Sequence, residues 1–287
     1  MNEQKIILNN ITSFELKDVF DCGQCFRWEE QNDGSYTGVI KQGVLNVSKV
    51  GQNVCIKGML NAPINEVVNY YFDLDYDYNK VKNDLSQIDA NMKQAVEFGS
   101  GIRIICQDLW EMLISYIISA NNNIPRIKKI INAISKKYGT RVEWNNQEYY
   151  LFPTVEQLAK ATQQDFRDLG AGFRDKYIFK TTQMVKNKEI DLDELTKIND
   201  SSKVREILEK CQGVGDKVAD CIMLFGMHRF DVFPIDVWVR RVMNDLYIHQ
   251  ADEKAVSKVF LQKYANQKFG DISGLAQQYL FYWRRSM

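Results

Sequence analysis

The sequence predicts an α+β fold in which an N-terminal antiparallel β-sheet domain precedes a helical region. Short runs rich in β-branched and aromatic residues, separated by Gly, Asn and Asp, fill the first part of the chain and are typical of hairpins. Farther on, apolar residues recur with the period of an amphipathic helix. The chain has 287 residues, which is room for two domains. We expect them to cover 1–101 and 102–287.

The predicted strands of the N-terminal domain form a β-meander. Turns containing Asn-Asp-Gly, Gln-Gly and Gly-Gln-Asn separate runs at 25–28, 35–41, 44–50 and 54–60. The following residues, 70–98, have a more helical pattern. The flexible tripeptide Gly99-Ser100-Gly101 is the expected joint between the domains.

The second domain is expected to be helical throughout. Pro125 and Gly139 fit the first position and the residue after the last turn of one helix. Asp236, Asp252 and Ser273 are expected helix N-caps. The predicted helices span 104–119, 125–138, 155–161, 163–169, 173–187, 203–211, 216–226, 237–247, 253–265 and 274–285.

Composition excludes several classes of protein. Hydrophobic residues make up 45% and charged residues 26% of the chain, which is ordinary for a packed domain and excludes disorder as the main state. No apolar run approaches the ~18 residues needed to span a membrane, and the first ten residues lack the features of a signal peptide. We therefore expect a cytoplasmic protein without membrane contact.

Charge and cysteine content say less about partners. Lys and Arg number 37, as do Asp and Glu, but residues 1–95 hold 9 basic against 13 acidic residues, so the remainder carries a net charge of +4. Any polyanion is therefore expected on the second part. Cys22 and Cys25 form an isolated C-x-x-C pair without a second ligand pair. The only histidines are His228 and His249, which disfavours a catalytic metal site.

The most informative stretch is a predicted helix-hairpin-helix at about 203–226. A helix runs into Gly213-Val214-Gly215, and a second helix begins at the next residues. Glycine tolerates the positive φ and the close approach that such a turn requires. The bare N–H groups at the helix start form an anion site that suits a DNA phosphate. An ordinary αα-turn is the alternative.

Lys217 follows this turn directly and is a candidate nucleophile. In the first turn of a helix the macrodipole disfavours an ammonium ion, and desolvation would lower the lysine pKa further. Asp236 follows in Pro-Ile-Asp at another helix start. A lysine nucleophile with an aspartate partner suits displacement at a sugar C1′ that leaves a Schiff base. The alternative is a surface lysine and a plain N-cap.

These residues resemble the catalytic core of the 8-oxoguanine DNA glycosylases, which belong to the helix-hairpin-helix glycosylase superfamily. The core match is G-V-G-D-K-V-A-D-C at 213–221, then P-I-D-V at 234–237. Four further matches extend the resemblance over nearly the whole chain: G-Q-C-F-R-W at 23–28, S-A-N-N-N-I at 119–124, L-G-A-G-F-R at 169–174, and Gly274-Leu275-Ala276-Gln277 with Phe281.

The resemblance implies a bifunctional glycosylase and AP lyase that excises 8-oxoguanine opposite cytosine. The base is flipped out of the duplex because its reacting atom is unreachable in the stack. Lys217 attacks C1′, and Asp236 stabilises the charged sugar and helps to manage the lysine proton. The Schiff base then permits β-elimination. No cofactor is required for this chemistry.

The resemblance also assigns the base pocket. The main-chain carbonyl of Gly23 accepts the hydrogen that only the oxidised base carries on N7. Gln277 reads the Watson–Crick edge, while Phe281 and Cys221 sandwich the purine. Helix core is the alternative for Phe281, and a small buried apolar residue is the alternative for Cys221.

On the opposite strand, Phe173 resembles the wedge beside the flipped nucleotide. The residues implied to contact the estranged cytosine and the backbone are Asn121, Arg126, Arg174, Gly213, Gly215 and Trp238. Trp238 stands where familiar members have His, and Arg284 stands where the family pattern has a carboxylate. These departures indicate a prokaryotic-type member, which would be associated with the nucleoid.

The implied partners are few. The substrate is double-stranded DNA containing 8-oxoguanine, and the protein is expected to be a monomer. A structural cation is a further possibility at the hairpin, where it would take the main-chain carbonyls of Glu209, Cys211 and Val214.

Three alternatives remain open. A monofunctional alkylpurine glycosylase would use an aspartate without Lys217. An adenine-removing mismatch glycosylase is disfavoured by the absence of four closely spaced C-terminal cysteines. A non-catalytic DNA-binding module needs only the hairpin and would not require Lys217 together with Asp236.

Overall fold

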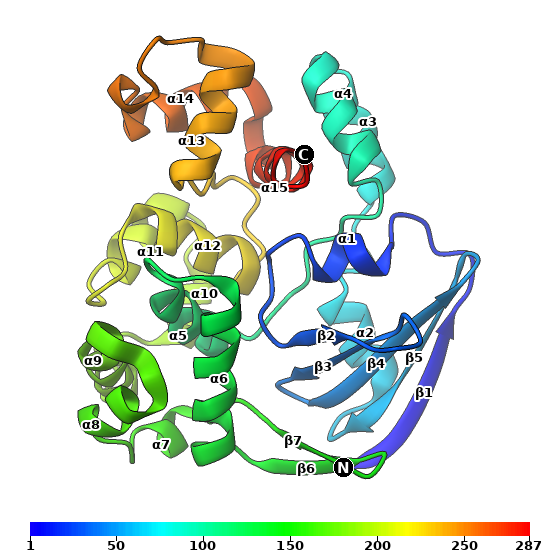
Figure 1. The fold of residues 1–287 in the computed structure, drawn as a ribbon, viewed down its shortest axis with the longest axis vertical. Helices are drawn as coiled ribbons and strands as arrows, with labels where there is room; N and C mark the ends of the chain where they lie inside the picture. The colour runs from blue at the N-terminus through cyan, green and yellow to red at the C-terminus, as the bar shows by residue number, and fades with distance from the viewer.

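The computed structural model describes residues 1–287, apart from the side chain of Glu253. Its first part is a twisted five-stranded antiparallel sheet, which lies beside a larger assembly of helices (Figure 1). The predicted α+β class is therefore confirmed. The strands are β1 (Asn2–Leu8), β2 (Trp28–Glu30), β3 (Tyr36–Ile40), β4 (Gly43–Val50), β5 (Asn53–Leu60), β6 (Arg141–Trp144) and β7 (Gln147–Tyr150).

The sheet has the strand order β1-β5-β4-β3-β2. Strands β3, β4 and β5 lie close to the predicted runs, and the 25–28 run is displaced to β2. The sequence analysis missed β1, which pairs along its whole length with β5, from Asn2 opposite Leu60 to Leu8 opposite Val54. Four polar residues precede three apolar ones in β1, so its sequence does not alternate, although its burial does, as in a half-buried edge strand.

The helices are distributed over the whole chain. They are α1 (Leu16–Phe20), α2 (Ile64–Tyr71), α3 (Tyr78–Ser86), α4 (Ala90–Phe98), α5 (Leu109–Ser119), α6 (Ile124–Tyr138), α7 (Val155–Leu158), α8 (Gln163–Phe166), α9 (Asp175–Lys186), α10 (Leu192–Lys197), α11 (Ser201–Leu208), α12 (Asp216–Gly226), α13 (Val237–Met243), α14 (Lys258–Phe269) and α15 (Ser273–Arg285).

Several element boundaries differ from the prediction. Helix α5 begins at Leu109 rather than at 104, because the Asp108 carboxylate caps it by accepting the Glu111 N–H at 3.0 Å. The second domain is not helical throughout, since β6 and β7 form a hairpin whose turn places Asn145 and Asn146 in the left-handed region. An Asn pair at such a turn is a readable hairpin signal, and the sequence analysis missed it, along with α10.

Of the three expected N-caps, Asp252 accepts the Lys254 N–H at 2.9 Å at the start of a short 3-10 helix, Glu253–Ala255, but it does not cap α14. Ser257 caps α14, where its hydroxyl accepts the Phe260 N–H. Ser273 is the first residue inside α15 rather than its cap. The third, Asp236, does cap a helix and is described below.

Two large buried cores hold the molecule together. One lies between the sheet and α1 and α2, where the Phe20 ring stacks on Trp28 at 4.1 Å between centroids. The other runs through the helical assembly and includes residues of α3 and α4. These two helices pack beside α15 near the C-terminus (Figure 1). The domain boundary after residue 101 stays a prediction.

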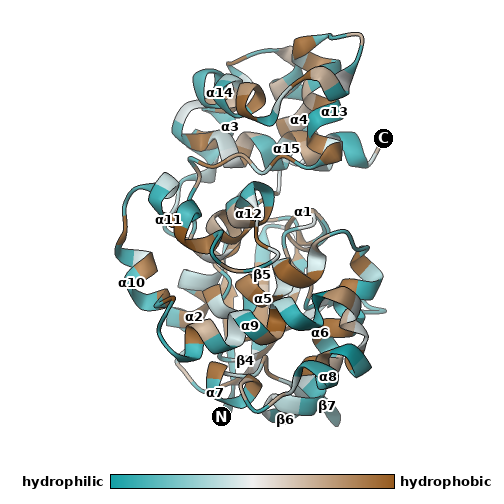
Figure 2. Cartoon of the chain, turned by 90° about the vertical axis from the view of Figure 1, so that its left-hand side faces the viewer, coloured by the Kyte–Doolittle hydropathy of each residue, from teal (hydrophilic) through white to brown (hydrophobic). Residues whose placement is uncertain are grey.

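The length and polarity of the helices decide whether any of them could cross a membrane. Hydrophilic segments interrupt the apolar ones along the helices in Figure 2. Within the part of the chain that the structure describes, no helix combines the length and the apolar character needed to cross a bilayer.

Candidate active site

The hairpin between α11 and α12 has the geometry that its glycines predict. Gly213 has φ +92°, and a Cβ there would lie 2.6 Å from the ring of Tyr177 in α9. Gly215 is extended, forms the N-cap of α12, and has open space where a Cβ would be. One glycine is therefore required by packing, while the other leaves the start of α12 accessible from outside.

Lys217 is the second residue of α12 and is half-buried. Its ammonium nitrogen lies 5.6 Å from the centroid of the Tyr116 ring, which belongs to the buried helix α5. Cys221 lies one turn farther along α12 and is also buried. Because residues four apart share a helix face, both side chains point to the same side of α12.

The expectation of a lowered pKa for Lys217 is wrong. Its pKa is raised, first by the charge of Cys221 and also by Asp236, although burial acts in the opposite direction. Burial raises the pKa of the Cys221 thiol to about 11, although the neighbouring Lys217 charge acts on that pKa in the opposite direction. The free protein therefore holds Lys217 as an ammonium ion at neutral pH.

Asp236 is the N-cap of α13, as its sequence context predicts. Its Oδ1 accepts the Val239 N–H at 2.7 Å, which fixes the carboxylate at the helix start. A carboxylate is favoured there by the helix dipole. The structure thus brings the candidate lysine and aspartate into one electrostatic unit at the N-termini of two helices.

The N-terminal segment around Gly23 meets the last helix. Gly23 has φ +92°, and a Cβ there would lie 3.3 Å from the Phe281 ring and 3.2 Å from Arg285 Nη1. Gln277 lies one turn before Phe281 on α15 and is buried. Residues separated by more than 250 positions in the sequence therefore converge, as one base pocket requires.

Three glutamines hold this segment in place, and the sequence analysis missed their roles. Gln278 donates to the Cys22 carbonyl at 2.6 Å. The Gln24 amide donates to the carbonyls of Val19 and Arg103 and accepts the Ile105 N–H. Gln107 donates to the Gln24 carbonyl. Among the described residues, no donor contacts the Gly23 carbonyl, so this oxygen keeps its acceptor capacity.

Arg285 is a second residue that the sequence analysis missed. Its guanidinium lies 5.6 Å from the centroid of the Phe281 ring. Nothing in the quoted motifs pointed to it, because its role depends on the placement of α15 against Gly23.

The predicted contacts to the opposite strand form one cluster. Arg174 is buried and donates to the carbonyls of Ala120 and Asn121, the latter at 2.6 Å. Arg126 donates to the Gly170 carbonyl at 3.2 Å. These bonds tie the 119–124 loop to the 170–174 loop.

Two aromatic side chains predicted to contact DNA protrude from the surface. Phe173 is 51% exposed. The Arg174 guanidinium lies over its ring, 4.3 Å from the ring centroid. Trp238 is 44% exposed in the first turn of α13. Tyr70, Phe98 and Phe260 are exposed to a similar degree, so exposure alone does not assign a role to either ring.

The hairpin carbonyls were predicted to hold a cation. The Cys211 carbonyl already accepts the Val214 N–H at 3.0 Å, and a carbonyl oxygen has a second lone pair for a further ligand. The proposed set of Glu209, Cys211 and Val214 stays a prediction.

Comparison with known proteins identifies the family. Residues 6–113 match the 8-oxoguanine DNA glycosylase N-terminal domain, and residues 114–267 match the HhH-GPD superfamily base excision DNA repair proteins. The chain belongs to the 8-oxoguanine DNA glycosylases of the HhH-GPD superfamily. The resemblance read from the motifs is therefore confirmed.

Individual relatives of this glycosylase cover nearly its full length. It is 32% identical to the N-glycosylase/DNA lyase of Saccharomyces cerevisiae over 85% of this chain and 71% of that protein. The apo structure of the Clostridium acetobutylicum 8-oxoguanine glycosylase/lyase has 45% identity and a TM-score of 0.92, with 98% of each chain covered. The same enzyme with double-stranded DNA containing cytosine opposite 8-oxoG gives 44% identity and 0.93, covering 99% and 97%.

Proposed function

We propose that this glycosylase removes 8-oxoguanine paired with cytosine and then cleaves the strand, with Lys217 as nucleophile and Asp236 as its partner. The observation that carries the proposal is the charge pairing of these two residues at the starts of α12 and α13, where Cys221 and then Asp236 raise the pKa of Lys217. The relatives named N-glycosylase/DNA lyase support the two-step activity.

The free protein holds Lys217 as an ammonium ion, so the reaction begins when this ion gives up a proton, which Asp236 passes on to solvent and so remains a carboxylate. Once the amine is free, its nitrogen forms a bond to C1′ and the bond from C1′ to the base breaks. Asp236 stabilises the positive charge that develops on the sugar. Ring opening leaves a Schiff base, and β-elimination then breaks the C3′–O bond on the 3′ side of the lesion.

Selection of the oxidised base rests on the Gly23 carbonyl. 8-Oxoguanine carries a hydrogen on N7, whereas guanine presents a lone pair there. One hydrogen bond gained, with the repulsion that guanine would meet, is worth about 2–4 kcal/mol. Phe281 and Cys221 would stack on the two faces of the purine, with Gln277 at its Watson–Crick edge.

The DNA-binding surface would combine the two linked loops with the hairpin. Asn121, Arg126 and Arg174 would contact the estranged cytosine, with Phe173 as the wedge. Gly213, Gly215 and Trp238 would lie at the phosphates. The chemistry uses side chains alone, and a cation on the carbonyls of Glu209, Cys211 and Val214 would only help to hold the hairpin.

Location and assembly complete the proposal. We expect the enzyme to act as a monomer in the cytoplasm, at the nucleoid of a prokaryotic cell. Its proposed contacts to DNA come from a single chain.

Borohydride trapping tests the nucleophile. Wild-type protein and the Lys217→Gln variant would be incubated with a duplex carrying one 8-oxoguanine opposite cytosine and then reduced. A covalent band is expected for wild type and for the control Lys203→Gln, whose lysine is exposed on α11. The band should disappear in Lys217→Gln. Base release by Lys217→Gln without a band would move the chemistry to Asp236 and contradict the lyase proposal.

A series of opposite bases tests the role of the arginines. Excision opposite cytosine is expected to be faster than opposite adenine by roughly 10- to 100-fold, since each well-placed base contact discriminates by about 1–3 kcal/mol. Single-turnover rates on four otherwise identical duplexes measure this. Equal rates on all four would show that Arg126 and Arg174 do not read the estranged base.

A further inference from the structure

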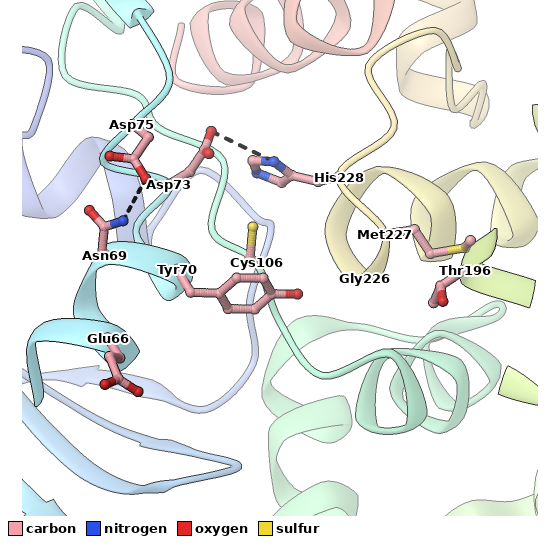
Figure 3. Close-up of a pocket in the computed structure, with 10 residues that line it drawn as sticks. All are labelled: Glu66, Asn69, Tyr70, Asp73, Asp75, Cys106, Thr196, Gly226, Met227 and His228. Carbon is pink, nitrogen blue, oxygen red and sulfur yellow. Dashed lines mark hydrogen bonds and ion pairs between the residues drawn. The ribbon is translucent and has the colours of Figure 1, made fainter. Parts of the chain in front are cut away.

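A pocket of about 600 Å³ opens on the side of the molecule where the segments after α2 and α12 meet the segment before α5. Figure 3 shows its lining residues, and the side chains of Asp73, Cys106 and His228 point toward one another at its inner end. Glu66 and Asp75 add two further carboxylates to the lining. None of these residues has a part in the excision reaction proposed above.

The three converging side chains offer a sulfur, a nitrogen and an oxygen atom that all lie within 4.8 Å of one another. His228 Nδ1 and Asp73 Oδ2 are 3.6 Å apart. Two ligand atoms in a tetrahedral zinc site, each about 2.0–2.2 Å from the metal, lie roughly 3.3–3.6 Å apart. The spacing of the imidazole and the carboxylate therefore suits a shared zinc ion.

The hydrogen bonds around these atoms leave their lone pairs facing the common centre. His228 Nε2 lies 3.1 Å from the Ile104 carbonyl, which is only an acceptor, so Nε2 carries the hydrogen. In the neutral imidazole the lone pair is then on Nδ1, the atom that faces the Asp73 carboxylate. Two acceptors at 3.6 Å repel each other unless a proton or a cation lies between them.

The same contacts are those that orient ligands in metal sites. A metal-binding histidine usually donates its other N–H to a carbonyl or carboxylate, and ligating carboxylates are themselves hydrogen-bonded. Here Nε2 pairs with the Ile104 carbonyl, and the Tyr78 hydroxyl donates to Asp73 Oδ2 at 2.9 Å. An outer shell is therefore already in place around two of the three side chains.

Backbone hydrogen bonds fix the positions of Cys106 and Asp73. Cys106 donates its N–H to the Tyr71 carbonyl at 2.8 Å, and Asp73 donates its own to Tyr70. Asp73 and His228 have φ of +50° and +57°, the left-handed region that non-glycine residues seldom adopt and that is found enriched at functional sites. The main chain therefore fixes where the side chains of Asp73 and Cys106 start.

One charge opposes a cation here. The Arg103 guanidinium donates to the main-chain carbonyl of Asp73 at 2.6 Å. The carboxylates of Glu66, Asp73 and Asp75 outweigh the positive charge of this guanidinium.

We propose that Asp73, Cys106 and His228 bind one Zn²⁺ ion, with the pocket side open for a water molecule as fourth ligand. Thiolate, imidazole and carboxylate are all zinc ligands, and the thiolate disfavours Mg²⁺ and Ca²⁺. Binding would release the Cys106 thiol proton to solvent and join Sγ to the metal. The ion would clamp the segment after α2 to the C-terminal end of α12, the helix that carries Lys217.

Zinc titration tests the proposal. Tag-free protein stripped with a chelator would be titrated with Zn²⁺ against a chromophoric competitor. One ion per chain is expected. Cys106→Ser and His228→Gln should each bind at least about 100-fold more weakly, because the loss of an outer partner alone costs 10- to 100-fold. Cys55→Ser, which alters a half-buried cysteine of β5, is the matched control and should bind as wild type does.

Two measurements guard against misfolded variants. Co²⁺ added to wild-type protein should give a thiolate-to-cobalt charge-transfer band that Cys55→Ser keeps and Cys106→Ser loses. Zinc at about 100 times its Kd should raise the Tm of wild type by roughly 3–5 °C, and borohydride trapping should persist in Cys106→Ser. Failure of wild type to bind zinc, or unchanged affinity in a trapping-competent Cys106→Ser, would overturn the proposal and leave an ion pair of Asp73 with His228.

Discussion

At the scale of single residues, the charge on Lys217 decides how catalysis must begin. Position in the first helical turn and burial both disfavour the ammonium ion. The pKa of Lys217 is nevertheless raised, first by the charge of Cys221 and then by the Asp236 carboxylate. The same aspartate that stabilises the resting ammonium can stabilise the positive sugar in the transition state, so the charge it compensates moves from the enzyme to the substrate.

Gly23 gives a prediction at this scale. Gly23→Ala places a methyl group 3.3 Å from the Phe281 ring and 3.2 Å from Arg285 in a backbone with φ +92°. We expect a stability loss of about 1–2 kcal/mol from the left-handed backbone and a single-turnover excision rate lowered at least tenfold, because the carbonyl and the ring shift apart. Urea unfolding and excision assays measure the two effects.

Gly34→Ala is the matched control for this variant. Gly34 also has a positive φ, +77°, but a Cβ there meets no atom within 4 Å. It should lose a similar amount of stability and keep its excision rate. Equal excision by both variants would argue against Gly23 as part of the base pocket.

At the scale of elements, α15 contributes residues to the proposed base pocket and also holds the N-terminal segment in place. Its Gln277 and Phe281 lie toward the proposed base pocket, while Gln278 donates to the Cys22 carbonyl and the Tyr282 hydroxyl donates to Asp18 at 3.1 Å. The last helix therefore both lines the pocket and holds the N-terminal segment that completes it. This explains why residues at the two ends of the chain can meet at one base.

The two glycines of the hairpin are expected to have different roles, one in stability and the other in DNA binding. Gly213→Ala would press a methyl group into the Tyr177 ring at 2.6 Å with φ +92°, so we expect a loss of about 2–3 kcal/mol in stability. Gly215→Ala has open space and an extended backbone, so stability should change by less than about 1 kcal/mol. Its methyl group would instead obstruct a phosphate at the start of α12.

Unfolding curves and DNA affinity for the two hairpin variants distinguish these effects. Gly215→Ala should bind duplex roughly tenfold more weakly while its Tm stays near that of wild type. If Gly215→Ala bound DNA normally, the hairpin would not be a phosphate site.

At the scale of the whole molecule, a buried ion pair lies between the sheet domain and the helices. Arg27, just before β2, has its Nη1 3.9 Å from the Glu111 carboxylate in α5. Arg27 also donates to the Ser135 hydroxyl at 2.9 Å and to the Tyr150 carbonyl at 2.5 Å. Burial raises the pKa of Glu111 to about 7, although Arg27 acts in the opposite direction.

This raised pKa predicts a pH-dependent stability. The folded state binds the Glu111 proton more tightly than the unfolded chain, whose pKa is near 4.5. The stabilisation is therefore complete below pH 4.5 and is lost as the pH rises through about 7, by about 3 kcal/mol. Glu111→Gln should remove this dependence. The free energy of unfolding of wild type should fall relative to that of Glu111→Gln between pH 4.5 and pH 8.

Urea unfolding of both proteins from pH 4.5 to 8 measures this difference. Glu97→Gln, an exposed glutamate of α4, controls for loss of a carboxylate and should follow wild type. A Glu111→Gln curve parallel to wild type would mean that this carboxylate does not titrate between the two pH values.

Local signals predicted much of the fold and of the candidate site. The turns around Gly34, Gly43 and Gly51 fixed strands β3 to β5, because hairpin turns demand positive φ. The glycines of the hairpin located α11 and α12 for the same reason. By contrast, β1 was missed because this edge strand is defined by its pairing with β5. That partner lies about fifty residues away in the sequence.

The sequence by itself determined the residues that chemistry requires: an amine after a glycine turn, a carboxylate at a helix start, and an ordered set of motifs that named the family. These depend on local backbone and on side-chain type. Only the tertiary structure decided the protonation of Lys217, the meeting of Gly23 with Phe281, and the convergence of Asp73, Cys106 and His228. Each of these depends on distances between residues far apart in the chain, which packing sets and local pattern does not encode.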